Sequence, residues 1–392
     1  MRAPGVTGRA VPCYGATMRH ALFAAMLLAL IAAPGCHHDA TSPRLRHDAP
    51  IRGADGLEVV ATLRSVVGNV AVSPTGRIFI TYHPAASPAV KVAEILPGDV
   101  SRPYPDDDWQ HRFQTPQGIK LDPKGRLWVL DHGKNGFGRP ALYGFDVASG
   151  TLVHEFDFGS EQGVGWGSYL NDLAIDADRD VVYIADTSSY RMRPALIVYD
   201  IAARRARRVL QGHPSVAAEH VDTVVEGKTL HLGFLSIRVA VDSITLDLPN
   251  AYLYFGPLSG TRLYRVPTAA LRDGALSPAA LAAAVEDYGP KPISDGITID
   301  RDDNIYFTAI EDHAVTVLRP PRAGDEAARQ ATMVRDPRLI WPDGLSFGEG
   351  GWVYVTDSQL NRVLFHSRRA IAKLGPHHLY RFRALAEGQP GR

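Results

Sequence analysis

Five polar residues and one glycine stand at matching positions of a phrase that the chain repeats six times. Each copy joins two apolar, β-type runs through a polar turn, as in PQGIKLDPKGRLWVLD from Pro116 and ISDGITIDRDDNIYFTA from Ile293. One marker residue near the start of each copy gives spacings of 49, 54, 71, 53 and 48 positions. The markers are Gly68, Gln117, Asn171, Asp242, Asp295 and Asp343. Amides and carboxylates bind cations, accept hydrogen bonds or move protons, so the repeat predicts a polar site if the fold brings these positions together.

The carboxylates are the most reactive part of this set. Three carboxylates in one place repel one another and raise one another's pKa unless a cation, a ligand amine or backbone N–H groups intervene. Asp242, Asp295 and Asp343 are therefore the candidate catalytic residues, as groups that move a proton. Together with Gln117 and Asn171 they form the predicted ligand-binding ring. The alternative is that each marker caps a turn through neighbouring backbone amides and binds no ligand.

The elements that position the ring follow from the length of the repeat. A period near 50 residues is that of one four-stranded blade, and no single copy can bury both faces of its strands. Six copies therefore predict an all-β fold, a six-bladed β-propeller, with the markers at one end of its central channel. The last phrase is followed by the strand HHLYRFRA and no obvious fourth strand, while a strand at residues 57–63 precedes the first phrase. We expect this N-terminal strand to close the last blade.

The 71-position interval predicts an insertion at about residues 213–238. It forms either a lid or extra hairpin over the channel or, the favoured interpretation, a longer pair of outer strands. Aromatic residues in other loops are candidate apolar walls for a planar ligand. They are Trp109, Phe137, Trp166 and Tyr169. Histidines at strand ends and in loops are expected to be solvated or hydrogen-bonded rather than catalytic. They are His132, His154, His213, His220, His231 and His313.

The N-terminus has the features of an export signal. Met18, Arg19 and His20 precede an apolar run too short to span a bilayer, so translation starts at Met1 or at Met18. Ala-Pro-Gly then precedes Cys36, which resembles a bacterial lipobox, and the alternatives are lipidation of Cys36 or an ordinary cleaved signal. We expect an exported, periplasmic or extracellular domain held to the outer membrane as a lipoprotein. The predicted boundaries are 1–35 for the signal peptide, 36–55 for a flexible tether, 56–385 for the propeller and 386–392 for a C-terminal tail.

Composition excludes several classes. The chain has 392 residues, with 42 Lys and Arg against 42 Asp and Glu, so its formal net charge is zero and no nucleic-acid partner is expected. Cys13 falls in the signal segment, and Cys36 alone cannot form an internal disulfide. The common hydrolase, nucleotide-binding and zinc motifs are absent from the sequence. The expected contacts are a small-molecule ligand and, through the lipid anchor, a membrane; the expected state is a monomer.

Four segments resemble the major royal jelly protein and insect yellow family. They are LYFGPLSGTRLYRV, DPKGRLWVLDHG, YIADTSSYRMRPALIVYDI and KPISDGITID, and the resemblance extends over roughly residues 56–385. It implies a secreted six-bladed propeller with a ligand site at the channel mouth. Insect members are credited with dopachrome conversion or amine binding, and bacterial members are described as dopachrome-tautomerase-related. The resemblance therefore implies isomerisation of a small cyclic or quinonoid compound, although the family has no catalytic motif that maps onto this chain residue by residue.

Two other functions remain open. Gluconolactonase and paraoxonase propellers hold a divalent cation near the axis, and Asn171 and Asp295 are the candidate ligands for calcium in a lactonase of that type. Those lactonases carry a Glu in the first blade, where this chain has Gly68, and the loss of an anionic ligand weakens calcium binding. A scaffold that binds proteins through a propeller face is the third hypothesis.

Overall fold

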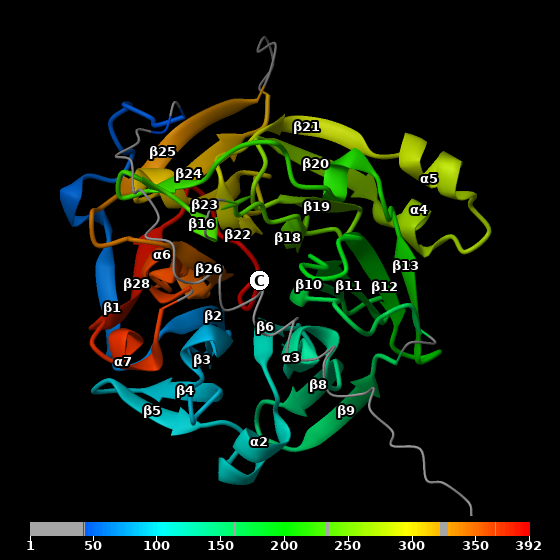
Figure 1. Ribbon diagram of the computed structural model, residues 1–392, viewed down its shortest axis with the longest axis horizontal. Coiled ribbons are helices and arrows are strands. Elements are labelled where there is room, and N and C mark those ends of the chain that lie inside the picture. The colour runs from blue at the N-terminus through cyan, green and yellow to red at the C-terminus, as the bar shows by residue number, and fades with distance from the viewer. Residues whose placement is uncertain (1–41, 43, 160–161, 233–234, 322–327, 365) are drawn as a thin grey trace, which may run out of the picture.

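The computed structural model describes residues 42, 44–159, 162–232, 235–321, 328–364 and 366–392. In this part of the chain, four-stranded antiparallel sheets stand around a central axis, one after another in sequence (Figure 1). There are six such sheets among the described residues, so the predicted six-bladed β-propeller is confirmed.

The strands are given for each blade from the axis outwards. Blade 1 has β2 (Val67–Val72), β3 (Ile78–Tyr82), β4 (Val92–Leu96) and β5 (Val100–Pro103). Blade 2 has β6 (Pro116–Leu121), β7 (Arg126–Asp131), β8 (Ala141–Asp146) and β9 (Leu152–Asp157). Blade 3 has β10 (Leu170–Asp176), β11 (Val181–Asp186), β12 (Ala195–Asp200) and β13 (Arg205–Val209). Blade 4 has β18 (Val241–Leu246), β19 (Tyr252–Pro257), β20 (Arg262–Pro267) and β21 (Glu286–Pro290). Blade 5 has β22 (Ser294–Ile299), β23 (Ile305–Ala309), β24 (Ala314–Arg319) and β25 (Arg329–Arg335). Blade 6 has β26 (Pro342–Phe347), β27 (Trp352–Asp357), β28 (His377–Arg383) and β1 (Glu58–Leu63).

Short helices lie in the connections between strands. The α-helices are α2 (Asp107–Arg112), α3 (Gly133–Gly136), α4 (Thr268–Arg272), α5 (Pro278–Ala283), α6 (Leu360–Val363) and α7 (Arg368–Ile371). The 3-10 helices are η1 (Ala54–Gly56), η2 (Pro84–Ala86), η4 (Pro214–Val216), η5 (Ile310–Asp312) and η6 (Glu349–Gly351). A search of the described residues finds no helix with the length and apolar character needed to cross a membrane.

The insertion forms two small hairpins rather than a longer outer strand pair, so the favoured prediction was wrong. The hairpins are β14 (Val224–Val225) with β15 (Lys228–Thr229) and β16 (His231–Leu232) with β17 (Leu235–Ser236). The reason is a tight turn, because Glu226 and Gly227 both have positive φ, at 49° and 71°. Two such residues form a two-residue turn, and the strands on either side pair at only two positions, Val224 with Thr229 and Val225 with Lys228.

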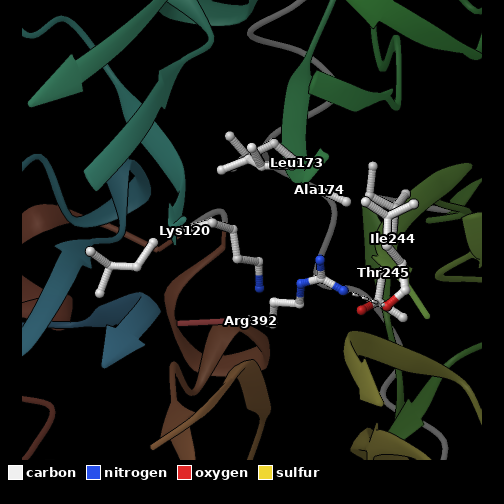
Figure 2. A pocket seen from close by; sticks show the side chains of 9 residues that line it. Lys120, Leu173, Ala174, Ile244, Thr245 and Arg392 are labelled. Carbon is white, nitrogen blue, oxygen red and sulfur yellow. Dashed lines mark hydrogen bonds between the residues drawn. The ribbon is translucent and has the colours of Figure 1, made fainter. Parts of the chain in front are cut away.

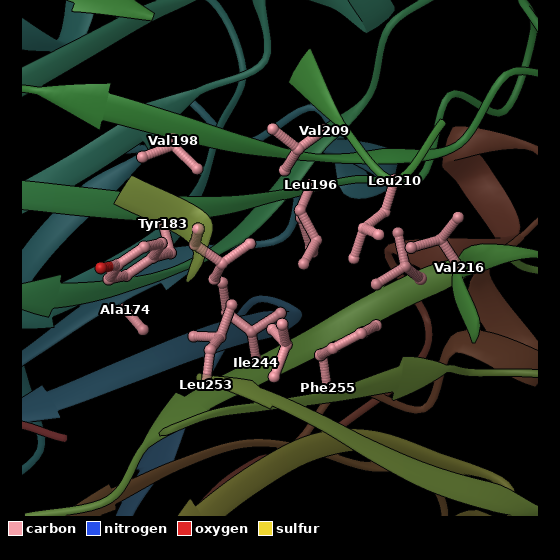
Figure 3. Close-up of a cluster of buried hydrophobic side chains, with 14 of the residues drawn as sticks. Ala174, Tyr183, Leu196, Val198, Val209, Leu210, Val216, Ile244, Leu253 and Phe255 are labelled. Atoms are coloured by element: carbon pink, nitrogen blue, oxygen red, sulfur yellow. The ribbon is translucent and has the colours of Figure 1, made fainter. Parts of the chain in front are cut away.

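The innermost strands form a closed ring in which each contacts the next around the axis. This order is β2, β6, β10, β18, β22 and β26, and β26 returns to β2. Nearly every residue of these strands is buried, because each strand is covered by its own blade and by the neighbouring ones. Apolar side chains fill the space between blades, as Leu196, Ile244 and Phe255 do between blades 3 and 4 (Figure 3). This packing fixes the position of everything that points into the channel.

Every innermost strand has a β-bulge at the same place. The pairing register shifts between Val67 and Val70, between Ser294 and Ile297, and at the matching positions of the other blades. Each bulge holds one marker residue and the residue after it. A bulge interrupts the alternation of side chains along a strand and re-aims them, so six equivalent bulges place six markers at one end of the channel. We call this end, where the innermost strands begin, the mouth.

Glycines and threonines let the bulges fit together. A Cβ at Gly296 would lie 2.0 Å from the carbonyl oxygen of Asp343, so the neighbouring strand approaches too closely for any side chain there. Thr356 Oγ1 donates to the carbonyl oxygen of Gly68 at 2.5 Å and accepts from Gly344 N at 2.9 Å. It thereby ties blade 6 to blade 1. Thr81 makes the same link from blade 1 to the Gln117 carbonyl at 2.8 Å.

The N-terminal strand closes the last blade, as predicted, because β1 pairs with β28. Ahead of β1, residues 44–52, the N-terminal strap, lie along blade 5. Ile51 N donates to Thr332 O at 2.9 Å, and Asp48 Oδ2 accepts from Thr332 N at 2.7 Å. The predicted signal peptide and Cys36 lie outside the described residues.

Candidate functional site

The structure brings the predicted ring residues of blades 3, 4 and 5 into contact at the mouth. Asn171 Nδ2 donates to Asp242 Oδ1, and Asp295 lies close enough to Asp242 for its charge to raise the pKa of Asp242. The indole Nε1 of Trp341 donates to Asp295 Oδ2 at 2.7 Å. We call Asp242, Asp295 and Asp343 the acid cluster. Asn171 connects the acid cluster to blade 3, and Trp341 connects it to blade 6.

The remaining ring positions carry side-chain oxygens without partners. Asp343 is 3% exposed, yet its Oδ2 has no hydrogen-bond partner among the described residues, and the same holds for Gln117 Oε1. An unpaired buried polar atom destabilises the folded state by roughly 1–3 kcal/mol. A water molecule or ligand atom that reached these two oxygens would supply the missing hydrogen bond. Gly68, the marker of blade 1, contributes no side chain.

The acid cluster holds protons more strongly than ordinary carboxyl groups. Burial raises the pKa of Asp295 to about 6, although the Trp341 indole counters part of this effect. Burial and the neighbouring Asp295 raise the pKa of Asp242 well above its usual range, and the same two causes raise the pKa of Asp343. Because neighbouring buried carboxyl groups repel one another when ionised, the three groups do not all ionise together, and the acid cluster shares protons near neutral pH.

Two buried lysines accompany these carboxylates. Burial lowers the pKa of Lys291 to about 7, while Glu219 and Asp242 act in the opposite direction. Its Nζ donates to Pro292 O at 2.9 Å, and its side chain passes over Gly256, where a Cβ would lie 2.9 Å from Lys291 Cε. Deeper in the channel, Lys120 Nζ lies 4.0 Å from Asp172 Oδ2. The charge of the channel is therefore mixed.

An aromatic wall adjoins the acid cluster. Tyr169 stacks on the ring of His132, with centroids 4.4 Å apart and planes 23° from parallel. Burial and the charge of Asp242 raise the pKa of Tyr169, so its hydroxyl stays protonated. Burial lowers the pKa of His132 to about 3, so the imidazole stays neutral. His132 Nδ1 accepts from Asn135 N at 2.8 Å, which makes its role structural.

Strand-end carboxylates hold the two aromatic side chains of the site in place. Asp186 Oδ1 accepts from Tyr169 N at 2.9 Å, and Asp357 Oδ1 accepts from Trp341 N at 2.7 Å. Asp131 makes the equivalent bond with Thr115 N in blade 2. These aspartates end the second strand of their blades and fix the loop that enters the first strand. They are positioning groups, unlike the markers.

Of the other aromatic candidates, Trp109 is buried against Tyr143 and Phe145 in the core, away from a ligand-binding surface. Phe137 and Trp166 are exposed in loops. Between blades 1 and 2, on the same side as the mouth, there is a cavity of about 270 Å³. Tyr82, Lys91, Thr115 and Pro116 are among the residues that line it. Pro116 directly precedes the marker Gln117 in the sequence.

The opposite end of the channel is closed by residues 385–392. Gly391 and Arg392 pair with the ends of two innermost strands, through Leu121 N to Gly391 O at 3.1 Å and Phe347 N to Arg392 O at 2.7 Å. The Arg392 side chain lies beside Lys120 and Thr245 (Figure 2). Its guanidinium donates to Asp247 O at 2.8 Å. The cavity left beside it is about 10 Å³, room for about one water molecule. The acid cluster is therefore reached from the mouth.

Two side-chain atoms of the predicted calcium ligands Asn171 and Asp295 have partners within the protein. The Asn171 amide donates to Asp242, and Asp295 Oδ2 is already bonded to an indole N–H. In the part of the chain that the structure describes, no group of three His, Cys, Asp or Glu side chains is spaced to hold a metal ion. A divalent cation stays a prediction, and metal analysis of the purified protein tests it.

Sequence reasoning identified the markers but not their partners Trp341, Lys291, Lys120 and Asp172. One signal was present in the repeat itself. Tyr169 and Trp341 both stand two residues before a marker, so two aromatics share one position of the phrase. Asp172 stands where three other copies have Gly118, Gly296 and Gly344. A carboxylate in place of a glycine at a close approach indicates a second polar layer.

Comparison with known proteins adds a family. A sequence profile described as Major royal jelly protein matches residues 114–371. Protein yellow of Drosophila subobscura is 25% identical over 281 residues, 66% of this chain and 48% of that protein. Protein yellow of Drosophila melanogaster is 26% identical over 280 residues, 66% of this chain and 50% of that protein. The chain thus spans about half the length of the curated relatives it matches.

Similar solved structures share the fold. A luciferin-regenerating enzyme superposes with a TM-score of 0.53 at 13% identity, over 86% of this chain and 97% of that one. A gluconolactonase from Xanthomonas campestris gives a TM-score of 0.52 at 12% identity, over 89% of this chain and 100% of that one. At such identities the likeness concerns the propeller architecture and does not extend to activity.

Proposed function

The chain belongs to the major royal jelly protein family, and from this premise we propose that it binds a small aromatic or cyclic compound at the mouth and isomerises it by proton transfer. The observation that carries the proposal is the group of Asp242, Asp295 and Asp343, which stand at matching bulges of three neighbouring innermost strands, with Asp242 and Asp343 buried. A carboxyl group whose pKa lies near the working pH serves both as acid and as base.

Each group has a defined role in this proposal. Asp295 in its ionised form removes a proton from one position of the bound ring, and the carboxylic acid so formed returns the proton at another position, so no atom is gained or lost. Asp242 shares the proton, and the Trp341 indole keeps Asp295 Oδ2 oriented. Lys291 offsets negative charge that develops on the ligand. Tyr169, on its His132 support, provides a flat surface for an aromatic ring.

A ligand screen followed by variants tests the proposal. Thermal-shift measurements with catechols, indoles, aromatic amines, quinonoid compounds such as dopachrome, and lactones identify the ligand class. With a turned-over compound, Asp295→Asn is expected to lower kcat by about 100-fold or more, the usual contribution of a general acid or base. Asp302→Asn, in an exposed turn of the same blade, is the matched control. Unchanged turnover after replacing Asp242, Asp295 and Asp343 by Ala would exclude the mechanism.

We also propose that the protein is exported and anchored through Cys36. The support is the apolar N-terminal run followed by a lipobox-like sequence. Mass spectrometry of the protein from membranes is expected to find Cys36 as a lipidated N-terminal residue. An unmodified chain cleaved at another position would refute the anchor and leave export intact. Metal analysis of the same sample separates the proposed isomerase from a lactonase, because a lactonase of this type needs a stoichiometric divalent ion.

A further inference from the structure

The mouth side of the propeller carries most of the exposed apolar surface. Ten large apolar side chains are exposed in the part of the chain that the structure describes. Six of them lie in connections that enter a first strand or join a second to a third strand, and in antiparallel blades those connections are on the mouth side. The six are Phe137, Trp166, Tyr190, Met192, Leu232 and Leu235.

Three of these residues form one aromatic patch, which we define as Phe137, Trp166 and Tyr190, and Met192 follows two residues after Tyr190. The Phe137 ring contacts both Trp166 and Tyr190 edge-on, with centroids 5.5 Å apart in each case. Trp166 is 65% exposed and Met192 77%. Large exposed apolar patches on a soluble domain mark a binding surface. The patch belongs to loops of blades 2 and 3.

Basic side chains accompany the patch. Lys134 lies in α3, three residues before Phe137, and Arg193 follows Met192; both are exposed, and no salt bridge of either is found among the described residues. Aromatic rings together with unpaired cations suit the interface of an anionic bilayer, where the ring sits at headgroup level and the cation meets lipid phosphate.

The N-terminal segment reaches the same side of the propeller from across the channel. Ser42 Oγ donates to Glu311 Oε2 at 2.8 Å, and Arg44 forms a salt bridge with Glu311 at 2.7 Å. Glu311 lies in η5, between the second and third strands of blade 5, opposite blade 2 in the ring. Cys36 precedes Ser42 by six residues in the sequence.

From the aromatic patch, its cations and the attachment of Ser42 and Arg44 to blade 5, we propose that the mouth side rests on a lipid surface, which the patch at blades 2 and 3 contacts. The mouth lies between the patch and the attachment at blade 5. Ligands then enter from the membrane interface, which selects ring compounds that partition into lipid headgroups. This inference rests on the proposed export and on the proposed ligand site.

Vesicle binding without the acyl chain tests the surface itself. The mature chain carrying Cys36→Ser, exported behind a signal peptide whose cleavage does not need Cys36, is mixed with sedimenting vesicles of phosphatidylethanolamine and phosphatidylglycerol. We expect binding that weakens by about tenfold or more in Trp166→Ser and in Phe137→Ser, since each removes a large aromatic contact. Val153→Ser, 51% exposed on the outer strand β9, is the matched control and keeps its binding.

Two outcomes would overturn the inference. One is that the Cys36→Ser chain stays in the supernatant at every lipid concentration. The other is that Trp166→Ser binds as well as Val153→Ser, as it would if the patch served a protein partner. Circular dichroism of each variant checks folding. Ligand binding measured in solution, without vesicles, reports on the proposed function separately, so the two failures are distinguishable.

Discussion

Replacing Trp341 by Phe removes one hydrogen-bond donor from the acid cluster and keeps most of the aromatic surface. The indole Nε1 lies 2.7 Å from Asp295 Oδ2, and it favours the ionised form of that carboxyl group. A hydrogen bond to a charged group contributes roughly 1.5–3 kcal/mol, and one pKa unit corresponds to about 1.4 kcal/mol. The variant is therefore expected to raise the pKa of Asp295, now about 6, by roughly one to two further units.

This shift has a definite sign in the free energy of unfolding. The pKa of Asp295 is 3.8 in an ordinary environment and about 6 in the fold, so the folded state binds more protons between these values. Stability is therefore highest below pH 4 with respect to this group, and it falls by on the order of 3 kcal/mol as the pH rises through 6. In Trp341→Phe the decline continues to roughly pH 8 and ends about 2 kcal/mol lower.

Urea unfolding of both proteins across this pH range measures the effect. Trp352→Phe is the matched control, because Trp352 lies in the same blade against Arg381 and Arg383 and has no bond to the acid cluster. It is expected to shift the curve equally at all pH values. If Trp341→Phe also gave a pH-independent offset, the indole would not stabilise the Asp295 carboxylate, and the assignment of this bond would be refuted.

Three further variants test other parts of the structure. Asp343→Asn removes a buried group with an unpaired Oδ2 and a raised pKa, so urea unfolding above pH 7 should show a gain of about 1 kcal/mol or more; a loss there would show that the carboxylate is stabilised in the fold. Thr356→Val keeps the shape of the side chain but leaves Gly344 N and Gly68 O unpaired, which should lower the free energy of unfolding by roughly 2 kcal/mol, whereas no change would mean that water replaces the hydroxyl. Arg392→Ala removes the guanidinium from the closed end of the channel, and calorimetry should find a lower Tm with ligand binding at the mouth retained; a loss of binding at unchanged Tm would contradict a purely structural closure.

The fold could be predicted because each blade repeats the same local pattern. Alternating and continuous apolar runs around polar turns give strands and hairpins, and the spacing gives the number of blades. The closing strand was also predictable, since β28 lacked a fourth partner and residues 57–63 had none. The insertion was predicted less well, because a turn at Glu226 and Gly227 decides its pairing and alternation does not show that turn.

The site was predictable in position but not in its bonds. One residue per copy at the same point of the phrase is enough to place Asp242, Asp295 and Asp343 at one end of the channel. The bond from Trp341 to Asp295 spans two blades, and nothing local specifies it. The same is true of Arg392, whose guanidinium meets the carbonyl of Asp247 across 145 residues of chain. A β-bulge also re-aims each marker, which a strict two-residue period cannot anticipate.

The protonation of the acid cluster at neutral pH is the most direct test of the central claim. Isotope-edited infrared spectra of protein with labelled aspartate report protonated carboxyl groups against a background of carboxylates. The structure predicts a protonated carboxyl signal that persists at neutral pH, loses intensity in Asp242→Asn combined with Asp343→Asn, and shifts when a ligand occupies the mouth. A spectrum in which every aspartate is ionised above pH 5, in the absence of a bound cation, would contradict it.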